Sequence, residues 1–264
     1  MDSGAVRSRA RSRHVSLAGA LAFGTALGLY YSFHERLWEV STGWDIAFMA
    51  LVLIPACFAL VWLLLPLRTW RWLLLLAIAL GSMAVLFHLA GWSTPENFCK
   101  LFALSAIGFW FLGWFETLSW VVLVALIIPF VDAYSVFSPR GPTNLIVKEH
   151  EHVFTGYLSF VFPVPGEPGS ANLGLPDLLF FALFLAAAAR FALRPGLTWL
   201  LMTLSFGATL AAAAYWRGVP ALPLLAIGFL VPNADLIWTR LRRGAEPGRH
   251  SVETGTRSSG QNDA

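Results

Sequence analysis

Charge is scarce in this chain of 264 residues. Charged side chains make up 12% of the sequence and hydrophobic ones 57%, whereas a soluble domain carries roughly a quarter charged residues. The two cysteines, Cys57 and Cys99, show no CxxC spacing and are too few for a disulfide framework. The net charge of +3 is small, and the arginines lie mostly at the chain ends and in short loops. These shortages exclude a soluble globular domain, a disulfide scaffold and a nucleic-acid-binding surface.

Long apolar runs are what the chain has instead. Runs of about 20 residues are long enough to cross the hydrocarbon core of a bilayer as helices. The sequence therefore predicts an all-α, polytopic helical membrane bundle of about eight spans, with the first span retained and not cleaved as a signal peptide. The predicted spans are residues 15–33, 44–66, 72–91, 101–115, 118–137, 173–193, 197–216 and 219–238.

The predicted organisation has two membrane halves between two polar tails. A basic cytoplasmic tail (1–14) precedes the N-terminal spans (15–117), and a second membrane half (118–239) precedes a polar, disordered tail (240–264). The second half contains the one long connection, residues 138–172, and loops of this length inside a compact bundle are usually functional or disordered. Within this loop, the aromatic and β-branched stretch Tyr157 to Phe162 is typical of a strand or an interfacial segment.

The positive charges indicate an orientation in the membrane. With the N-terminus inside, thirteen of the 18 lysines and arginines fall in cytoplasmic segments. Because cytoplasmic loops are enriched in these residues, we expect a multi-pass protein of the cell membrane with both termini in the cytoplasm and loop 138–172 outside.

Two acids interrupt the apolar runs on either side of the long loop. Asp132 lies six residues before Ser138 in the fifth span, and Asp177 lies about four residues after Leu173 at the start of the sixth. At 1.5 Å per residue these depths are about 9 and 6 Å, so the carboxyl groups are expected to face one another if the two spans pack as antiparallel neighbours. An ionisable side chain inside a membrane indicates a functional site.

Two neighbouring carboxyl groups have a definite chemistry. They share one proton, so that one activates a water molecule while the other polarises a carbonyl, which hydrolyses a peptide bond without a metal or cofactor. Neither acid can be assigned to either role from the sequence, because the pair titrates as a unit. Transporters also use aspartate pairs, so the residues alone favour proteolysis and ion or proton translocation equally.

The neighbours of the two acids favour special backbone geometry. Pro129 removes a backbone hydrogen bond one turn before Asp132. Gly174 permits backbone conformations that other residues avoid, and Pro176 suits the first turn of a helix. Asp177 would then lie near a helix N-terminus, where the helix dipole favours its anion.

Three motifs in this half of the chain resemble those of a known family. Val131-Asp132 is followed by Ser138-Pro139-Arg140-Gly141-Pro142, then Gly174-Leu175-Pro176-Asp177, then Pro220-Ala221-Leu222-Pro223. In this order and spacing they resemble the three motifs of the presenilin and signal peptide peptidase family, the GxGD intramembrane aspartyl proteases. The resemblance covers about residues 100–238.

The resemblance implies a fold, an activity and a set of site residues. It implies a presenilin-like bundle, typically of nine spans, in which Asp132 and Asp177 are the catalytic pair. The substrates would be transmembrane helices or remnant signal peptides taken from the lipid bilayer, with accessory subunits left open. The sequence departs from the family pattern at Val131, where an aromatic residue is usual, and at Pro176, which replaces the second glycine of GxGD. Residues implied to shape the active site are Gly174, Leu175, Pro176, Pro220, Ala221, Leu222 and Pro223.

Other readings of the same residues remain as alternatives. A protein of this fold without catalysis would act as a membrane chaperone or as an ion or proton pathway. The run His150-Glu151-His152 lacks the HExxH spacing of a zinc site, so a solvated loop and no metal is expected. His88 with Ser205 lacks a supporting serine-hydrolase motif and is expected to be a hydrogen-bonded core histidine. Glu116, and Asp235 with Asn233, are expected at the ends of spans.

Overall fold

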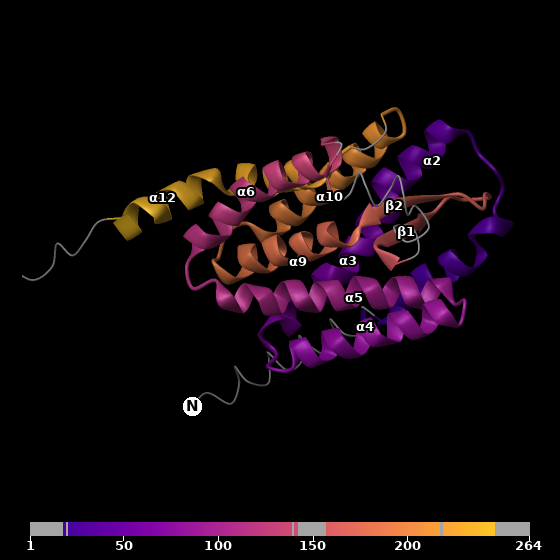
Figure 1. Cartoon of the computed structure of the whole chain (residues 1–264), viewed down its shortest axis with the longest axis horizontal. Helices are drawn as coiled ribbons and strands as arrows, with labels where there is room; N and C mark the ends of the chain where they lie inside the picture. Colours follow the sequence, from indigo (N-terminus) through magenta and orange to yellow (C-terminus); the bar gives the residue numbers. More distant parts are fainter. Residues whose placement is uncertain (1–17, 20, 139, 142–156, 217–218, 246–264) are drawn as a thin grey trace, which may run out of the picture.

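Helices lying side by side, with one small β-hairpin, make up the computed structural model, which describes residues 18–19, 21–138, 140–141, 157–216 and 219–245 (Figure 1). Residues 21–33 are helical and precede the labelled elements. The α-helices of the first half are α2 (Thr42–Phe48), α3 (Ile54–Leu64), α4 (Leu73–Leu89) and α5 (Ser93–Phe111). Those of the second half are α6 (Leu118–Phe137), α9 (Leu175–Arg190), α10 (Pro195–Ala213), α11 (Leu222–Leu230) and α12 (Ala234–Ala245).

Short turns of other helix types connect or interrupt these helices. One is a π-turn, η2 (Met49–Leu53), which lies directly before Pro55, a residue that cannot donate a backbone hydrogen bond. The others are 3₁₀ turns: η1 (His34–Arg36), η3 (Leu65–Thr69), η4 (Leu112–Trp114) and η5 (Val231–Asn233).

The described helices include five continuous segments that are long and apolar enough to cross a membrane. By length and composition these are residues Thr42–Thr69, Ser93–Trp114, Leu118–Phe137, Pro195–Ala213 and Leu222–Arg242, and Leu73–Leu89 is a shorter apolar helix. The predicted helical membrane protein is therefore confirmed in outline, and the number of eight spans stays a prediction. The predicted tail begins too early, because α12 continues to Ala245.

Two predictions about secondary structure are wrong. The chain is not all-α, because β1 (Ser159–Pro163) pairs antiparallel with β2 (Ser170–Gly174); the predicted strand is β1, and β2 was not predicted. The segment 92–100, which lies between the predicted spans 72–91 and 101–115 and was therefore expected to be a loop, is helical, because α5 begins at Ser93. Glu96 and Lys100 lie one turn apart on this helix with their charged atoms 2.6 Å apart, so that each offsets the burial of the other's charge.

Helix α9 is the centre of the bundle. Every side chain from Phe181 to Ala188 has no exposed surface, as expected for a helix that is apolar all round. It lies between α5 on one side and α10 and α11 on the other (Figure 1). Helix α5 approaches at Gly108, where a Cβ would lie 2.7 Å from the Leu179 carbonyl oxygen. Close backbone approach through a small residue is a common way to pack helices in membranes.

Helix α6, by contrast, lies at the outside of the bundle and packs mainly against α11 (Figure 1). Only Leu118, Val121 and Ala125 of its twenty residues are buried. Large apolar side chains such as Phe130 and Phe137 are exposed along it, which suits a helix that faces lipid. Pro129 lies inside α6, and the helix continues through it to Phe137.

Candidate functional site

The two predicted acids line one cavity. Its volume is about 340 Å³, and both Asp132 of α6 and Asp177 of α9 contribute to its wall. Other residues of the three motifs line it too, namely Gly174, Pro176, Pro220 and Ala221. The structure thus brings together residues that are far apart in the sequence. Leu175, Leu222 and Pro223 do not line the cavity and lie in the first turns of α9 and α11.

The Asp132 carboxyl group is held by the start of α11. Its Oδ2 accepts a hydrogen bond from the backbone N–H of Leu222 at 3.0 Å, and the backbone N–H of Ala221 also donates to this carboxyl. The first N–H groups of a helix have no partner within the helix, so they are available to an acceptor from another element. Pro223 follows at the second position of α11, where its missing N–H removes none of the bonds within the helix.

The Asp177 carboxyl group is held by the start of its own helix. Asp177 is the third residue of α9, and the backbone N–H of Gly174, the N-cap residue, donates to its carboxyl. This is the reciprocal half of a capping box, which fixes the side chain over the first turn. Asp177 is 9% exposed. A Cβ at Gly174 would lie 3.1 Å from Oδ2 of Asp177, so glycine at this position leaves room for the carboxyl.

Each of the two carboxyl groups therefore lies at a helix N-terminus. Asp132 is bound by the N-terminus of α11 and Asp177 by that of α9, and the two carboxyls interact electrostatically across the cavity. A helix N-terminus favours negative charge, whereas the neighbouring carboxylate disfavours it. Acid–base hydrolysis by two carboxyl groups requires one of them ionised and the other protonated, and these two opposing influences act on the same pair.

The β-hairpin leads directly into this site. Strand β2 ends at Gly174, and its residues Asn172, Leu173 and Gly174 line the cavity. The hairpin is the part of the long connection that the structure describes between residues 157 and 174. The hairpin places β2 beside the two acids. The sequence pattern indicated only the strand-like stretch that becomes β1.

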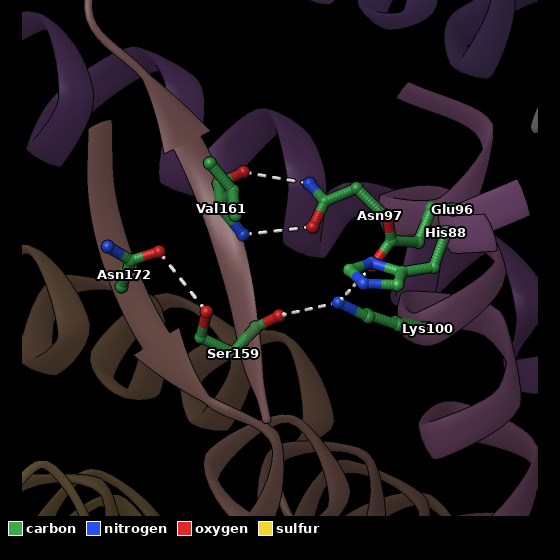
Figure 2. A network of polar contacts seen from close by, with 7 residues as sticks. All are labelled: His88, Glu96, Asn97, Lys100, Ser159, Val161 and Asn172. Atoms are coloured by element: carbon green, nitrogen blue, oxygen red, sulfur yellow. Dashed lines mark hydrogen bonds and ion pairs between the residues drawn. The ribbon is translucent and has the colours of Figure 1, made fainter. Parts of the chain in front are cut away.

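Polar side chains of α5 bind the edge of β1 that is not paired with β2, as Figure 2 shows. The Asn97 amide donates to the Val161 carbonyl at 2.8 Å and accepts from the Val161 N–H at 2.9 Å, as a neighbouring strand would. The Lys100 ammonium group donates to the Ser159 carbonyl, and it is paired with Glu96, which also contacts His88. These contacts occupy the outer edge of β1, so the hairpin is attached firmly to α5.

The hydroxyl of Ser159 joins the two strands at the level of the candidate site. It donates to the Asn172 amide oxygen at 3.2 Å. Asn172 in turn lines the cavity with the two acids. A continuous line of polar contacts therefore runs from His88 on α4 through α5 and the hairpin to the site (Figure 2).

The structure separates the serine-hydrolase candidates. His88 Nδ1 lies 3.1 Å from Glu96, and its ring is tilted against that of Tyr157, whereas the Ser205 hydroxyl donates to the Leu201 carbonyl of its own helix. His88 is thus hydrogen-bonded as expected, but it is only partly buried and does not lie in the core. Among the residues that the structure describes, no cluster of three His, Cys, Asp or Glu side chains could hold a metal ion. The run His150-Glu151-His152 lies outside these residues.

The remaining polar candidates lie outside the cavity with the two acids. Asp235 forms a bidentate ion pair with Arg194 on the exposed side of α12. Asn233 is buried and binds the Arg194 backbone N–H and the Thr198 hydroxyl, so it ties the start of α10 to η5. Glu116 is exposed between η4 and α6, as expected for a residue at the end of a span.

Sequence reasoning missed two groups of buried polar residues. Glu96 and Lys100 were placed in a loop, although their i,i+4 spacing with opposite charge is typical of a helix. Asp45 was not singled out, although it lies at the start of a long apolar run and is only 4% exposed. The signal for Asp45 was the same as for the other acids, an ionisable residue within a membrane-spanning segment.

Comparison with known proteins adds no assignment: no protein-family model and no curated protein matches the chain.

Proposed function

We propose that this protein is an intramembrane aspartyl protease that hydrolyses peptide bonds of transmembrane helices or remnant signal peptides with Asp132 and Asp177. The observation that carries the proposal is that two carboxyl groups from different helices line one cavity, each at a helix N-terminus. The resemblance of the three motifs to presenilin and signal peptide peptidase supports the same activity.

The reaction follows from the chemistry of a carboxyl pair. The ionised carboxylate takes a proton from a water molecule, whose oxygen attacks the scissile carbonyl carbon, while the protonated carboxyl donates its proton to the carbonyl oxygen. The tetrahedral intermediate, a diol, then collapses: the C–N bond breaks, the proton on the first carboxyl passes to the leaving amine, and the second carboxylate takes a proton from one hydroxyl of the diol as the C=O of the new carboxylic acid forms. The first carboxyl is then ionised and the second protonated, as at the start. No metal or cofactor takes part.

The substrate segment would have to be extended at the site, because a helix shields its own peptide bonds. Strand β2 offers an edge for this purpose, since β1 covers one of its edges and its residues 172–174 line the cavity. An extended peptide adding to a sheet edge gains main-chain hydrogen bonds that are independent of its side chains. Binding of this kind would allow substrates with varied apolar sequences to be cleaved.

Pro176 is the point at which the site departs from the family pattern. It is the second residue of α9, where its fixed φ suits the first turn, and its ring lines the cavity. A ring in place of glycine narrows the space beside Asp177 and stiffens the helix start. We expect Pro176→Gly to widen the range of substrates accepted, which a panel of peptides with small and large residues near the cleavage site would measure.

Cleavage of a single-span peptide by purified protein in detergent tests the proposal. We expect two products with defined masses, and a rate at least about a thousandfold lower for Asp132→Asn and for Asp177→Asn. Asp235→Asn is the matched control, because this acid is exposed on α12 outside the cavity. Wild type and Pro176→Gly both inert toward a varied peptide panel, or either cavity variant as active as wild type, would contradict the proposal.

The same proteins in liposomes separate proteolysis from translocation. A proton flux that requires Asp132 and Asp177, in protein that cleaves no peptide, would replace the protease by an ion or proton pathway. A folded protein with neither activity would leave the chaperone alternative. Accessibility of cysteines introduced at exposed hairpin positions would establish whether this side faces outward, as the charge distribution predicts.

A further inference from the structure

A second cavity adjoins the candidate active site. Its volume is about 320 Å³, and it lies between the start of α2, the hairpin and the end of α10. Asn172, Leu210 and Ala213 line both this cavity and the one that contains the two acids. The two cavities are therefore neighbours that share part of their walls, including Asn172 of β2.

The second cavity contains an unpartnered buried carboxyl. Asp45 lines it and is 4% exposed, and its Oδ1 has no hydrogen-bond partner among the described residues. A buried acceptor without a partner is unfavourable and rare in folded proteins, which makes the Asp45 carboxyl a candidate to bind a donor group. Rotation about the Asp χ2 angle exchanges the two oxygens, so either can be presented to the cavity.

The charges around this cavity are all of one sign. Glu167 is a second carboxylate in its wall, and no lysine, arginine or histidine belongs to the residues that line it. The polar atoms that remain come from Thr42, Ser170 and Asn172. A cationic group is the ligand that such a wall favours, because it would give Asp45 the partner that the described residues do not provide.

The length of β2 gives the approximate distance between the Asp45 cavity and the two acids. It runs from Ser170 beside the Asp45 cavity to Gly174 beside Asp177. These four steps span about 13 Å at 3.3 Å per residue. An extended peptide along the strand would therefore place a side chain near Asp45 when the peptide bond three to five residues away lies at the acids.

We propose that Asp45 is a specificity subsite that binds a lysine or arginine side chain of the substrate, three to five residues from the scissile bond. This inference rests on the proposed protease function. Asp45 is the fourth residue of α2 and so lies within one turn of the end of its span. Long lysine and arginine side chains near the ends of membrane-spanning helices reach the interface, so a substrate segment at this depth can carry one.

Binding of a labelled peptide tests the subsite without requiring catalysis. The protein is the full chain with Asp177→Asn, and the peptides are single-span sequences with lysine or glutamine at the third, fourth or fifth position from the cleavage site. We expect the lysine peptide to bind at least about tenfold more tightly at one of these positions. Adding Asp45→Asn should abolish this ratio, Asp45→Glu should retain part of it, and Asp235→Asn should leave it unchanged.

The outcomes separate the subsite from the protease. Equal binding of lysine and glutamine peptides, binding of neither, or a ratio that survives Asp45→Asn would overturn the subsite. Cleavage of both peptides by wild-type protein with equal kcat/KM would do the same and leave the protease standing. A lysine preference in binding that depends on Asp45, in a protein whose wild type cleaves nothing, would support the subsite and refute the proposed protease.

Discussion

The two helices that carry the acids, α6 and α9, differ in how deeply they are buried and in which element binds the carboxyl group. Helix α9 is buried from Leu178 to Ala188 except at Leu179 and Phe180, which are partly buried, whereas α6 buries only three side chains. Asp177 is fixed by the N-cap of its own helix, whereas Asp132 is fixed by the start of a different helix, α11. One half of the pair thus belongs to the rigid centre and the other to the periphery.

This difference has a functional meaning. In the proposed protease, a substrate helix in the bilayer would reach the cavity from the side, past an element with few protein contacts. Helix α6 meets this condition, because apart from α11 it faces outward along most of its length. Movement of α6 would carry Asp132 with it and break the contact to Leu222, while Asp177 stays in place. In this account the catalytic pair is complete only when α6 is docked on α11.

The largest expected effect on stability contrasts the same substitution in the two helices. Phe184 of α9 is fully buried and stacks on Phe229 with 4.9 Å between ring centroids, whereas Phe130 of α6 is 76% exposed. We expect Phe184→Ala to lower the free energy of unfolding by about 3 kcal/mol because it leaves a cavity. Phe130→Ala should change it by less than about 0.5 kcal/mol. Unfolding in detergent measures both, and equal effects would refute the contrast between the helices.

A smaller effect on stability is expected where α5 binds the hairpin that precedes α9. Glu96→Gln removes the negative partner of the buried Lys100 ammonium group, 2.6 Å away, and should destabilise the fold by about 2 kcal/mol. Asp235→Asn breaks the exposed ion pair with Arg194 and should cost less than about 1 kcal/mol. Denaturant titrations compare the two acid-to-amide changes. A Glu96→Gln protein as stable as Asp235→Asn would show that the network does not anchor the hairpin.

A further effect tests how closely α5 and α9 pack. Gly108→Ala places a methyl group 2.7 Å from the Leu179 carbonyl oxygen, which requires a backbone shift and should cost about 1–2 kcal/mol. Gly81 of α4 has nothing within 4 Å of the corresponding position, so Gly81→Ala should be neutral or slightly stabilising. The difference in thermal midpoint between the two variants measures the contact. Equal midpoints would mean that the backbones of α5 and α9 can move apart here without a loss of stability.

The smallest effect concerns the N-cap beside Asp177. Gly174 has extended backbone angles that any residue adopts, so Gly174→Ala strains only the space next to the carboxyl, where a Cβ would lie 3.1 Å from Oδ2. We expect a change in stability of less than about 1 kcal/mol, together with a lower cleavage rate. Activity and unfolding measured on the same sample separate the two effects. A loss of stability without a loss of rate would argue against a role for this contact in positioning Asp177.

Local patterns made part of this structure predictable. The run 118–137 matches α6 at both ends, because the apolar segment is bounded by polar residues and followed by the Ser-Pro stretch. The meeting of Asp132 and Asp177 at one cavity followed from depths counted from the same loop. The strand at 159–163 was visible from its aromatic and β-branched residues.

Other features depend on long-range contacts that composition does not encode. Ser170 to Gly174 has no strand signature of its own and becomes β2 only because it pairs with β1. The i,i+4 spacing of Glu96 and Lys100 indicates a helix, but their burial depends on the hairpin, which supplies a carbonyl for the ammonium group. The sequence did not indicate that α9 is buried and α6 exposed, since both runs are apolar all round and α6 is the more apolar of the two. Asp45 carried the sequence signal of an ionisable residue within a span, but the cavity beside it is a feature of the folded chain alone.

The central claim is that Asp132 and Asp177 act as one catalytic unit, and a double-mutant comparison of cleavage rates tests it most directly. Two groups that share one proton fail together, so the effects of the two substitutions must be far from additive. We predict that Asp132→Asn, Asp177→Asn and the double variant all lower the rate by the same factor, about a thousandfold, within about threefold of one another. A double variant whose loss equals the product of the two single losses would contradict the account.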